Sequence, residues 1–152
     1  MNQRSRTPAG LVLLLTFLLS AGYVWSTRVD GRPGQGQTLV QLEQAIANPD
    51  ATTETWLHYG QCLQQERRYD HAASAYQRVL ETDPYSRVAN FQCVAALALL
   101  GDGDRLHAFL VKLIQLDPRL ALDVFARPEL QRYLKQPRFA EAHKQAIVQS
   151  MD

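Results

Sequence analysis

The residues of this sequence whose side chains could support chemistry are two cysteines and four histidines. His58 and Cys62 are four positions apart, a spacing that places two metal ligands on one face of a helix. No other cysteine or histidine follows at a ligand spacing, so we do not expect a metal site here. The heme attachment motif Cys-x-x-Cys-His does not occur in the sequence.

The other histidines give no catalytic constellation. Asp70 and His71 are interpreted as the start of a helix with a solvated histidine rather than as part of a catalytic triad. His107 and His143 have no nucleophile paired with them in the sequence. There is also no glycine-rich loop that would hold a phosphate group. We therefore expect that the protein is not an enzyme, and that it uses no cofactor, metal or small-molecule substrate.

Two pairs of residues have structural interpretations instead. Cys62 and Cys93 are expected on equivalent helices of successive repeats, where they form either two buried free thiols or a disulfide. Asp102 and Asp104 are expected at the N-terminus of a helix, where a negative charge is favourable and an aspartate caps free backbone N–H groups.

Composition excludes one class of function. The chain has 152 residues, with 16 Lys and Arg against 15 Asp and Glu. A nucleic-acid-binding surface requires a clear excess of basic residues, so we expect no nucleic-acid partner.

An uncharged run from Ala9 to Trp25, AGLVLLLTFLLSAGYVW, follows Arg4 and Arg6. An apolar run of this length predicts a transmembrane signal-anchor, with a cleaved signal peptide as the alternative. Basic residues before the run favour a cytoplasmic position for residues 1–8. In a bacterium this predicts a single-pass inner-membrane protein whose C-terminal domain lies in the periplasm.

Residues 26–37, STRVDGRPGQGQ, are rich in glycine and proline and are predicted to be a flexible linker. The domain is expected to comprise residues 38–152. Apolar residues recur there at helical spacing, and no stretch alternates with the period of a strand, so an all-α fold is predicted. Pro84 is expected to open a helix that ends at Gly101, and later prolines divide the C-terminal part into shorter helices.

A 34-residue spacing relates two parts of the predicted domain. Asp83-Pro84 recurs as Asp117-Pro118, and the same shift takes Tyr76 onto Leu110. A 34-residue period with two helices per unit is typical of tetratricopeptide repeats. The residues that match the pattern of that family are Trp56, Tyr59, Gly60, Leu63, Ala72, Tyr76 and Pro84.

The chain thus resembles the tetratricopeptide repeat (TPR) family. The resemblance implies a short helical solenoid with repeats at about 53–86 and 87–118, a capping helix before them and a C-terminal cap at 119–152. Gly60 and Ala72 are expected to let two antiparallel helices touch, with Trp56 and Tyr76 around that contact. A third repeat is not expected, because Pro128 would interrupt its first helix.

In this family the first helix of each repeat lines a concave groove that binds a polypeptide. Carried onto this sequence, the groove residues of the first repeat are Glu54, Leu57, Gln61, Gln64 and Gln65. Those of the second are Val88, Phe91, Ala95, Ala98 and Leu99. Because the helix from Val88 to Leu100 is apolar on all sides, either the C-terminal helices or an amphipathic helix of a partner must cover it.

The segment from residue 39 to residue 84 also resembles the membrane-anchored TPR domains of bacterial cytochrome c maturation factors. That resemblance implies binding of the C-terminal helix of an apocytochrome. The expected function is that of an envelope scaffold or chaperone for a protein or peptide partner, with cytochrome c biogenesis as a specific version. The alternative is a structural subunit of an envelope or secretion complex.

Overall fold

The computed structural model describes residues 38–151, and within them every regular element is a helix. The seven α-helices of this part are α2 (Leu39–Ile46), α3 (Thr53–Gln65), α4 (Tyr69–Thr82), α5 (Arg87–Leu100), α6 (Gly103–Leu116), α7 (Pro118–Phe125) and α8 (Pro137–Gln149), and the 3-10 helix η1 (Pro128–Leu130) lies between the last two. The all-α prediction is confirmed for these residues. The predicted membrane segment, the cytoplasmic N-terminus and the linker lie outside them.

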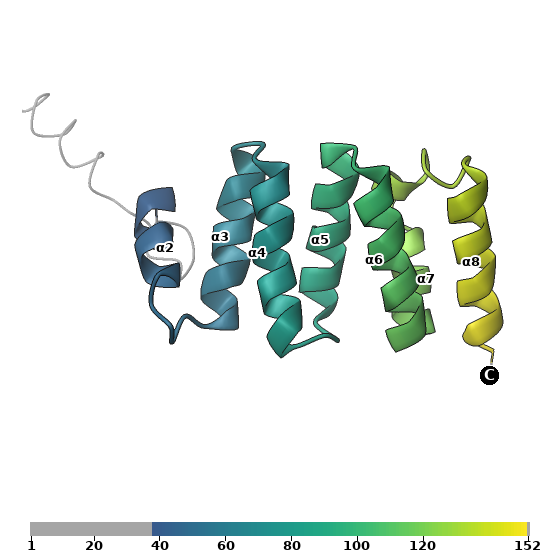
Figure 1. Ribbon diagram of the computed structural model, residues 1–152, viewed down its shortest axis with the longest axis horizontal. Helices are drawn as coiled ribbons and strands as arrows, with labels where there is room; N and C mark the ends of the chain where they lie inside the picture. The colour runs from purple at the N-terminus through teal and green to yellow at the C-terminus, as the bar shows by residue number, and fades with distance from the viewer. Residues whose placement is uncertain (1–37, 152) are drawn as a thin grey trace, which may run out of the picture. The chain divides into compact units, whose positions relative to one another are not determined.

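The helices from α2 to α6 stand side by side in chain order, and α7, η1 and α8 complete the row (Figure 1). Successive helices are antiparallel, so α3 and α5 run in the same direction on either side of α4. None of the helices of the described part has the length and hydropathy needed to cross a bilayer.

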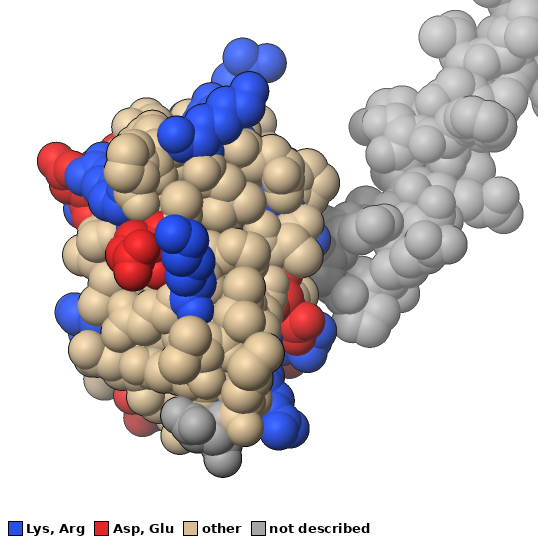
Figure 2. All heavy atoms as spheres, turned by 90° about the vertical axis from the view of Figure 1, so that its right-hand side faces the viewer, with Lys and Arg blue, Asp and Glu red and all other residues tan. Residues whose placement is uncertain are grey.

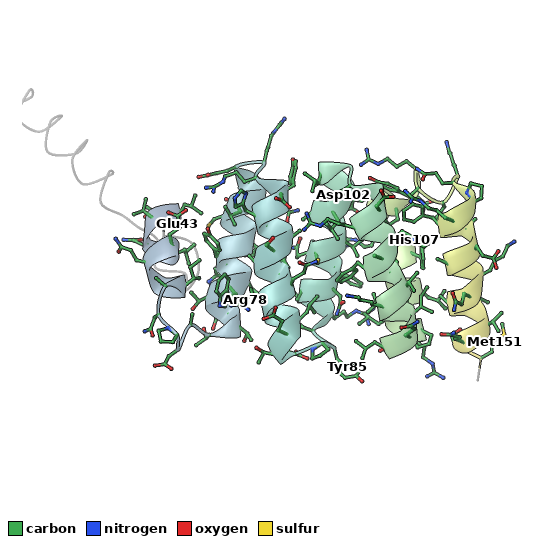
Figure 3. All side chains as sticks on the ribbon, viewed as in Figure 1. Glu43, Arg78, Tyr85, Asp102, His107 and Met151 are labelled. Carbon is green, nitrogen blue, oxygen red and sulfur yellow. The ribbon has the colours of Figure 1, made fainter. Side chains whose placement is uncertain are left out.

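Polar side chains define where these helices begin. Thr38 and Thr52 cap α2 and α3, and Asp102 caps α6 by accepting a hydrogen bond from the backbone N–H of Arg105 at 3.0 Å. Figure 3 shows Asp102 in the turn between α5 and α6, at the upper edge of the row, whereas Tyr85 lies at the lower edge. The predicted capping role of Asp102 is confirmed.

The prediction that Pro84 opens a helix is wrong. Pro84 lies in the turn before α5, which begins only at Arg87. Asp83 accepts a hydrogen bond from the backbone N–H of Tyr85, and Asn90 donates from Nδ2 to the carbonyl of Pro84. These bonds hold the turn in a non-helical form. Pro118, by contrast, does begin α7.

The helix starts follow the 34-residue spacing beyond residue 118, although the sequence predicts no third repeat there. α4, α6 and α8 begin at Tyr69, Gly103 and Pro137, so each start follows the previous one by the same full repeat. Pro128 does interrupt the helical run after α7, and η1 with the following turn takes the chain across to α8. The row therefore continues past residue 118 with an altered helix pair.

Apolar residues on the inner faces of α3 to α8 form one core. Positions that correspond in successive repeats are buried together: Leu63 with Leu97, and Tyr76 with Leu110. At the C-terminal end of the row, α8 buries Phe139, Ala142 and Ala146. Lysine, arginine and acidic side chains are interspersed over this end face (Figure 2), as expected for a surface in contact with water.

Candidate functional site

The two cysteines lie on separate helices of the row, α3 and α5. Cys62 and Cys93 are both free thiols, and α4 packs between the helices that bear them. Burial raises the pKa of the Cys93 thiol to about 12, so this sulfur is held in its protonated form. Among residues 38–151, no three His, Cys, Asp or Glu side chains are grouped so that they could hold a metal ion.

Asp70, Asp104 and His107 form contacts between helices of the row. Asp70 on α4 pairs with Arg105 on α6 at 2.5 Å, and Asp104 on α6 pairs with Arg138 on α8 at 2.5 Å. The hydrogen bond from Arg105 lowers the pKa of Asp70. The His107 ring packs edge-on against Phe139, with centroids 5.4 Å apart. Each of these contacts joins two helices of the row.

The residues predicted to set the helix packing lie close to the contact of α3 with α4. A Cβ atom at Gly60 would lie 2.6 Å from Cε1 of Tyr76, so this close approach requires glycine. The ring of Tyr76, rather than Ala72, supplies the nearest atoms. Ala72 and Leu63 are fully buried, and Tyr76 donates from its hydroxyl to Oε1 of Gln64 at 3.0 Å.

Trp56 and Tyr59 lie beside that contact, on the same face of α3. Both are half-buried, and their rings meet edge to face with centroids 6.1 Å apart. They form the floor of an open hollow of about 360 Å³, which Arg78 and other residues of α4 line on the other side. The guanidinium of Arg78 lies 6.0 Å from the Trp56 ring, close enough for a weak cation–π contact.

The residues predicted to line a groove on α3 are accessible. Glu54, Gln61 and Gln65 are exposed, and Leu57 and Gln64 are half-buried. Three of these residues, Gln61, Gln64 and Gln65, line a hollow of about 280 Å³ together with Gln92 of α5. Gln92 is not among the predicted groove residues, because the family pattern assigns no groove residue to that position. Its spacing of one helical turn from Val88 was the available signal.

On α5, the first half of the predicted groove is open. Val88 is 52% exposed. The Phe91 ring lies close to two guanidinium groups, with Arg87 5.3 Å and Arg127 5.5 Å from its centroid. Arg87 is in turn paired with Asp123 of α7 at 2.7 Å. Two arginines, of which Arg87 is paired with Asp123, therefore border one side of this face of α5.

The second half of the predicted groove on α5 is closed, so Ala95 and Ala98 are not available to a ligand. Both side chains are buried, and the carbonyl of Ala98 accepts hydrogen bonds from the Tyr133 hydroxyl at 3.1 Å and from Arg132. The segment that follows the break at Pro128 provides this cover, because η1 packs on α5. Of the two alternatives for covering α5, the chain's own C-terminal segment accounts for this half. Leu99 remains 47% exposed.

Within residues 38–151 the stacked antiparallel helices define an all-α domain, and the most accessible part of the predicted site is the face formed by α3 and the first half of α5. No model of a known protein family matches the chain, and no curated protein or solved structure matches it either.

Proposed function

We propose that this protein is a membrane-anchored TPR-type scaffold or chaperone that binds a polypeptide partner in the cell envelope. The observation that carries the proposal is the accessible face of α3, where Gln61, Gln64 and Gln65 border a hollow that Gln92 of α5 completes. Parallel helices α3 and α5 form the two sides of this face. The helix starts at 34-residue spacing support the comparison with TPR arrays.

The anchor in this proposal is the run from Ala9 to Trp25, and the partner-binding domain lies outside the cytoplasm. In the specific version that the family resemblance implies, the partner is the C-terminal helix of an apocytochrome c. In the alternative version, the domain is a permanent subunit of an envelope or secretion complex.

Site-specific photocrosslinking of the full-length chain in intact cells tests the proposal. A photoreactive residue at Gln61 is expected to crosslink a polypeptide, whereas the same residue at exposed Gln115 of α6 serves as the matched control. A crosslink at Gln61 alone supports a client held in the groove. Crosslinks at both positions, from a complex that survives purification in detergent, support the alternative subunit role. If neither position crosslinks a polypeptide, the proposal is wrong.

A titration of the detergent-solubilised chain tests the cytochrome version. A fluorescent peptide with the sequence of the C-terminal helix of an apocytochrome c should bind, and the substitution Val88→Glu should weaken binding by placing a charge on the exposed apolar position. No saturable binding would exclude cytochrome c maturation as this chain's role.

A further inference from the structure

We infer that the hollow lined by Gln61, Gln64, Gln65 and Gln92, here called the glutamine hollow, binds the main chain of an extended, uncharged peptide segment. This inference rests on the proposed function and adds to it the chemical class of the partner. It concerns hydrogen bonding by neutral amides, which none of the groove residues of the apolar half can provide.

The glutamine hollow has a defined position in the fold. Its volume is about 280 Å³, and three of its side chains come from the last turns of α3 while the fourth comes from α5. Gln61 and Gln65 are exposed, and Gln64 and Gln92 are half-buried. The amides of two parallel helices therefore face one open space rather than being scattered over the surface.

Only neutral amides line this hollow, since the described part of the chain contributes no charged side chain to it. Each glutamine offers an N–H donor pair and a carbonyl acceptor, the same two groups that a peptide unit offers. A carboxylate or phosphate group would instead call for arginine or lysine. The chemistry therefore favours an uncharged partner that presents both donors and acceptors.

The orientation of one amide is fixed by the core. Tyr76 donates its hydroxyl hydrogen to Oε1 of Gln64 at 3.0 Å, and Tyr76 itself is fully buried. This bond identifies Oε1 as the inner atom, so the NH₂ group of Gln64 is the part left for a ligand. A donor held in place loses less conformational freedom on binding than a free side chain.

The spacing of the amides suits an extended chain. Gln61 and Gln65 are four residues apart on a helix, which corresponds to a rise of about 6 Å. In an extended peptide, equivalent groups recur every second residue, at about 6.6–6.8 Å. Two successive peptide groups on one edge of an extended chain can thus hydrogen-bond to the two glutamines, as they do to a neighbouring strand in a β-sheet.

Neighbouring residues limit the length of the bound segment. On α5, the Tyr133 hydroxyl and Arg132 already occupy the carbonyl of Ala98, so a bound peptide cannot donate to this carbonyl. In the other direction, Val88 lies one turn before Gln92 and is 52% exposed, which provides a contact for one apolar side chain. The geometry fits a short segment with an apolar residue at one end.

A peptide selection on the full-length, detergent-solubilised chain tests the inference. A library of random twelve-residue peptides is selected on the wild-type chain, and the strongest peptide is titrated by calorimetry. We expect enriched peptides without charged residues in their central part. We also expect the double substitution Gln61→Ala, Gln92→Ala to weaken binding about thirtyfold, since it removes two net hydrogen bonds to the peptide. N-methylation of central peptide nitrogens should weaken binding similarly.

The control variant is Gln115→Ala with Gln145→Ala, which removes two exposed glutamines of α6 and α8 and should leave the affinity unchanged. Thermal unfolding of each variant verifies that the fold is retained. Peptides that bind as amphipathic helices, or whose binding ignores the glutamine substitutions, overturn the inference but leave the proposed function intact. Failure to enrich any peptide overturns both.

Discussion

The pair α3–α4 and the pair α5–α6 occupy equivalent places in the row, yet they are packed differently. Cα atoms approach more closely across α3 and α4 than across α5 and α6. Gly60 and Ala72 in the first pair correspond to Val94 and Leu106 in the second, one repeat later. Larger side chains at the same positions hold the second pair further apart, so helix spacing in this fold is set residue by residue.

On the outer side of the two helix pairs, a large and a small side chain have changed places between the helices. In the first, Trp56 faces the small Ala75 across an open hollow. In the second, Asn90 stands at the position of Trp56 and Phe109 at that of Ala75, and the remaining space is only about 120 Å³. The aromatic ring has moved from one helix to its neighbour. The two pairs thus fill the corresponding space with an aromatic side chain, although the residue that supplies it differs.

The largest expected difference between the pairs is in thiol reactivity. Cys93 of α5 has a pKa of about 12 against an ordinary value of 9.0, so at pH 8 its thiolate population should be about a thousandfold lower than that of an unperturbed thiol. Cys62 of α3 is only half-buried, although burial also raises its pKa. In the native full-length chain, Cys62→Ser should therefore leave a thiol that an alkylating reagent modifies very slowly, whereas Cys93→Ser should leave one that reacts readily. Equal rates for the two variants would contradict the burial difference.

The next largest effect is expected for Gly60→Val, which introduces into α3 the residue found at the equivalent position of α5, Val94. Overlap with the Tyr76 ring should lower the free energy of unfolding by about 3 kcal/mol. Adding Tyr76→Leu, the residue found at position 110, should recover part of this loss. Denaturant unfolding measures both. The control is Gly103→Ala, whose new Cβ would approach closely only the movable end of Arg138, with Tyr133 at an ordinary contact distance, and should change stability by less than about 1 kcal/mol. A Gly60→Val effect no larger than this control would refute the close approach.

Asn90 provides a third test, because it replaces the tryptophan of the first pair with a hydrogen-bonding residue. Its Nδ2 donates to the carbonyls of Pro84 and Ser86 at 3.0 and 2.9 Å, and the side chain is buried. Asn90→Ala should cost about 1–3 kcal/mol, since it removes two hydrogen bonds made by a buried side chain. Asn48→Ala, in an exposed turn, is the matched control and should cost less. Equal melting temperatures for the two variants would show that the Asn90 bonds contribute nothing.

The turns that close the two pairs differ at one equivalent position. Arg67 has a left-handed backbone with φ of 60°, and Gly101, at the same place in the next repeat, has φ of 83°. This region disfavours side chains other than glycine. Arg67→Gly should therefore stabilise the protein by roughly 0.5–1 kcal/mol, and Gly101→Ala should destabilise it by about 1 kcal/mol. Chemical denaturation should give shifts of opposite sign, and shifts of the same sign would contradict this account.

The smallest expected effect is the pH dependence of the ion pair between the two pairs. Arg105 lowers the folded-state pKa of Asp70, so the pair stabilises the fold above the unfolded pKa of about 3.9 and the contribution is lost as the pH falls through the lower, folded value. Because both side chains are exposed, the effect should be no more than about 1 kcal/mol. The difference in unfolding free energy between wild type and Asp70→Asn, measured from pH 7 to pH 2, should shrink with acidification. A constant difference would exclude the pair as its cause.

Much of the fold could be predicted from local features. Helical periodicity and the prolines at 118, 128 and 137 predict the elements because they act within one or two turns of backbone. The start of α5 could not be predicted at Pro84, since the competing hydrogen bonds of Asp83 and Asn90 come from side chains whose positions depend on packing. Gln92 escaped prediction for a related reason: the hollow that its side chain lines is formed mainly by residues of α3 and not by its own helix.

Local sequence features account for the helical content, the regular spacing of corresponding core positions and the accessible polar face of α3, because periodic burial and turn residues act within one or two turns of the chain. That Tyr76 fills the space left at Gly60, and that the segment around Tyr133 closes half of the face of α5, follows from the packing of the helices. Both depend on contacts between residues distant in the chain, and such contacts form only when the helices are packed together.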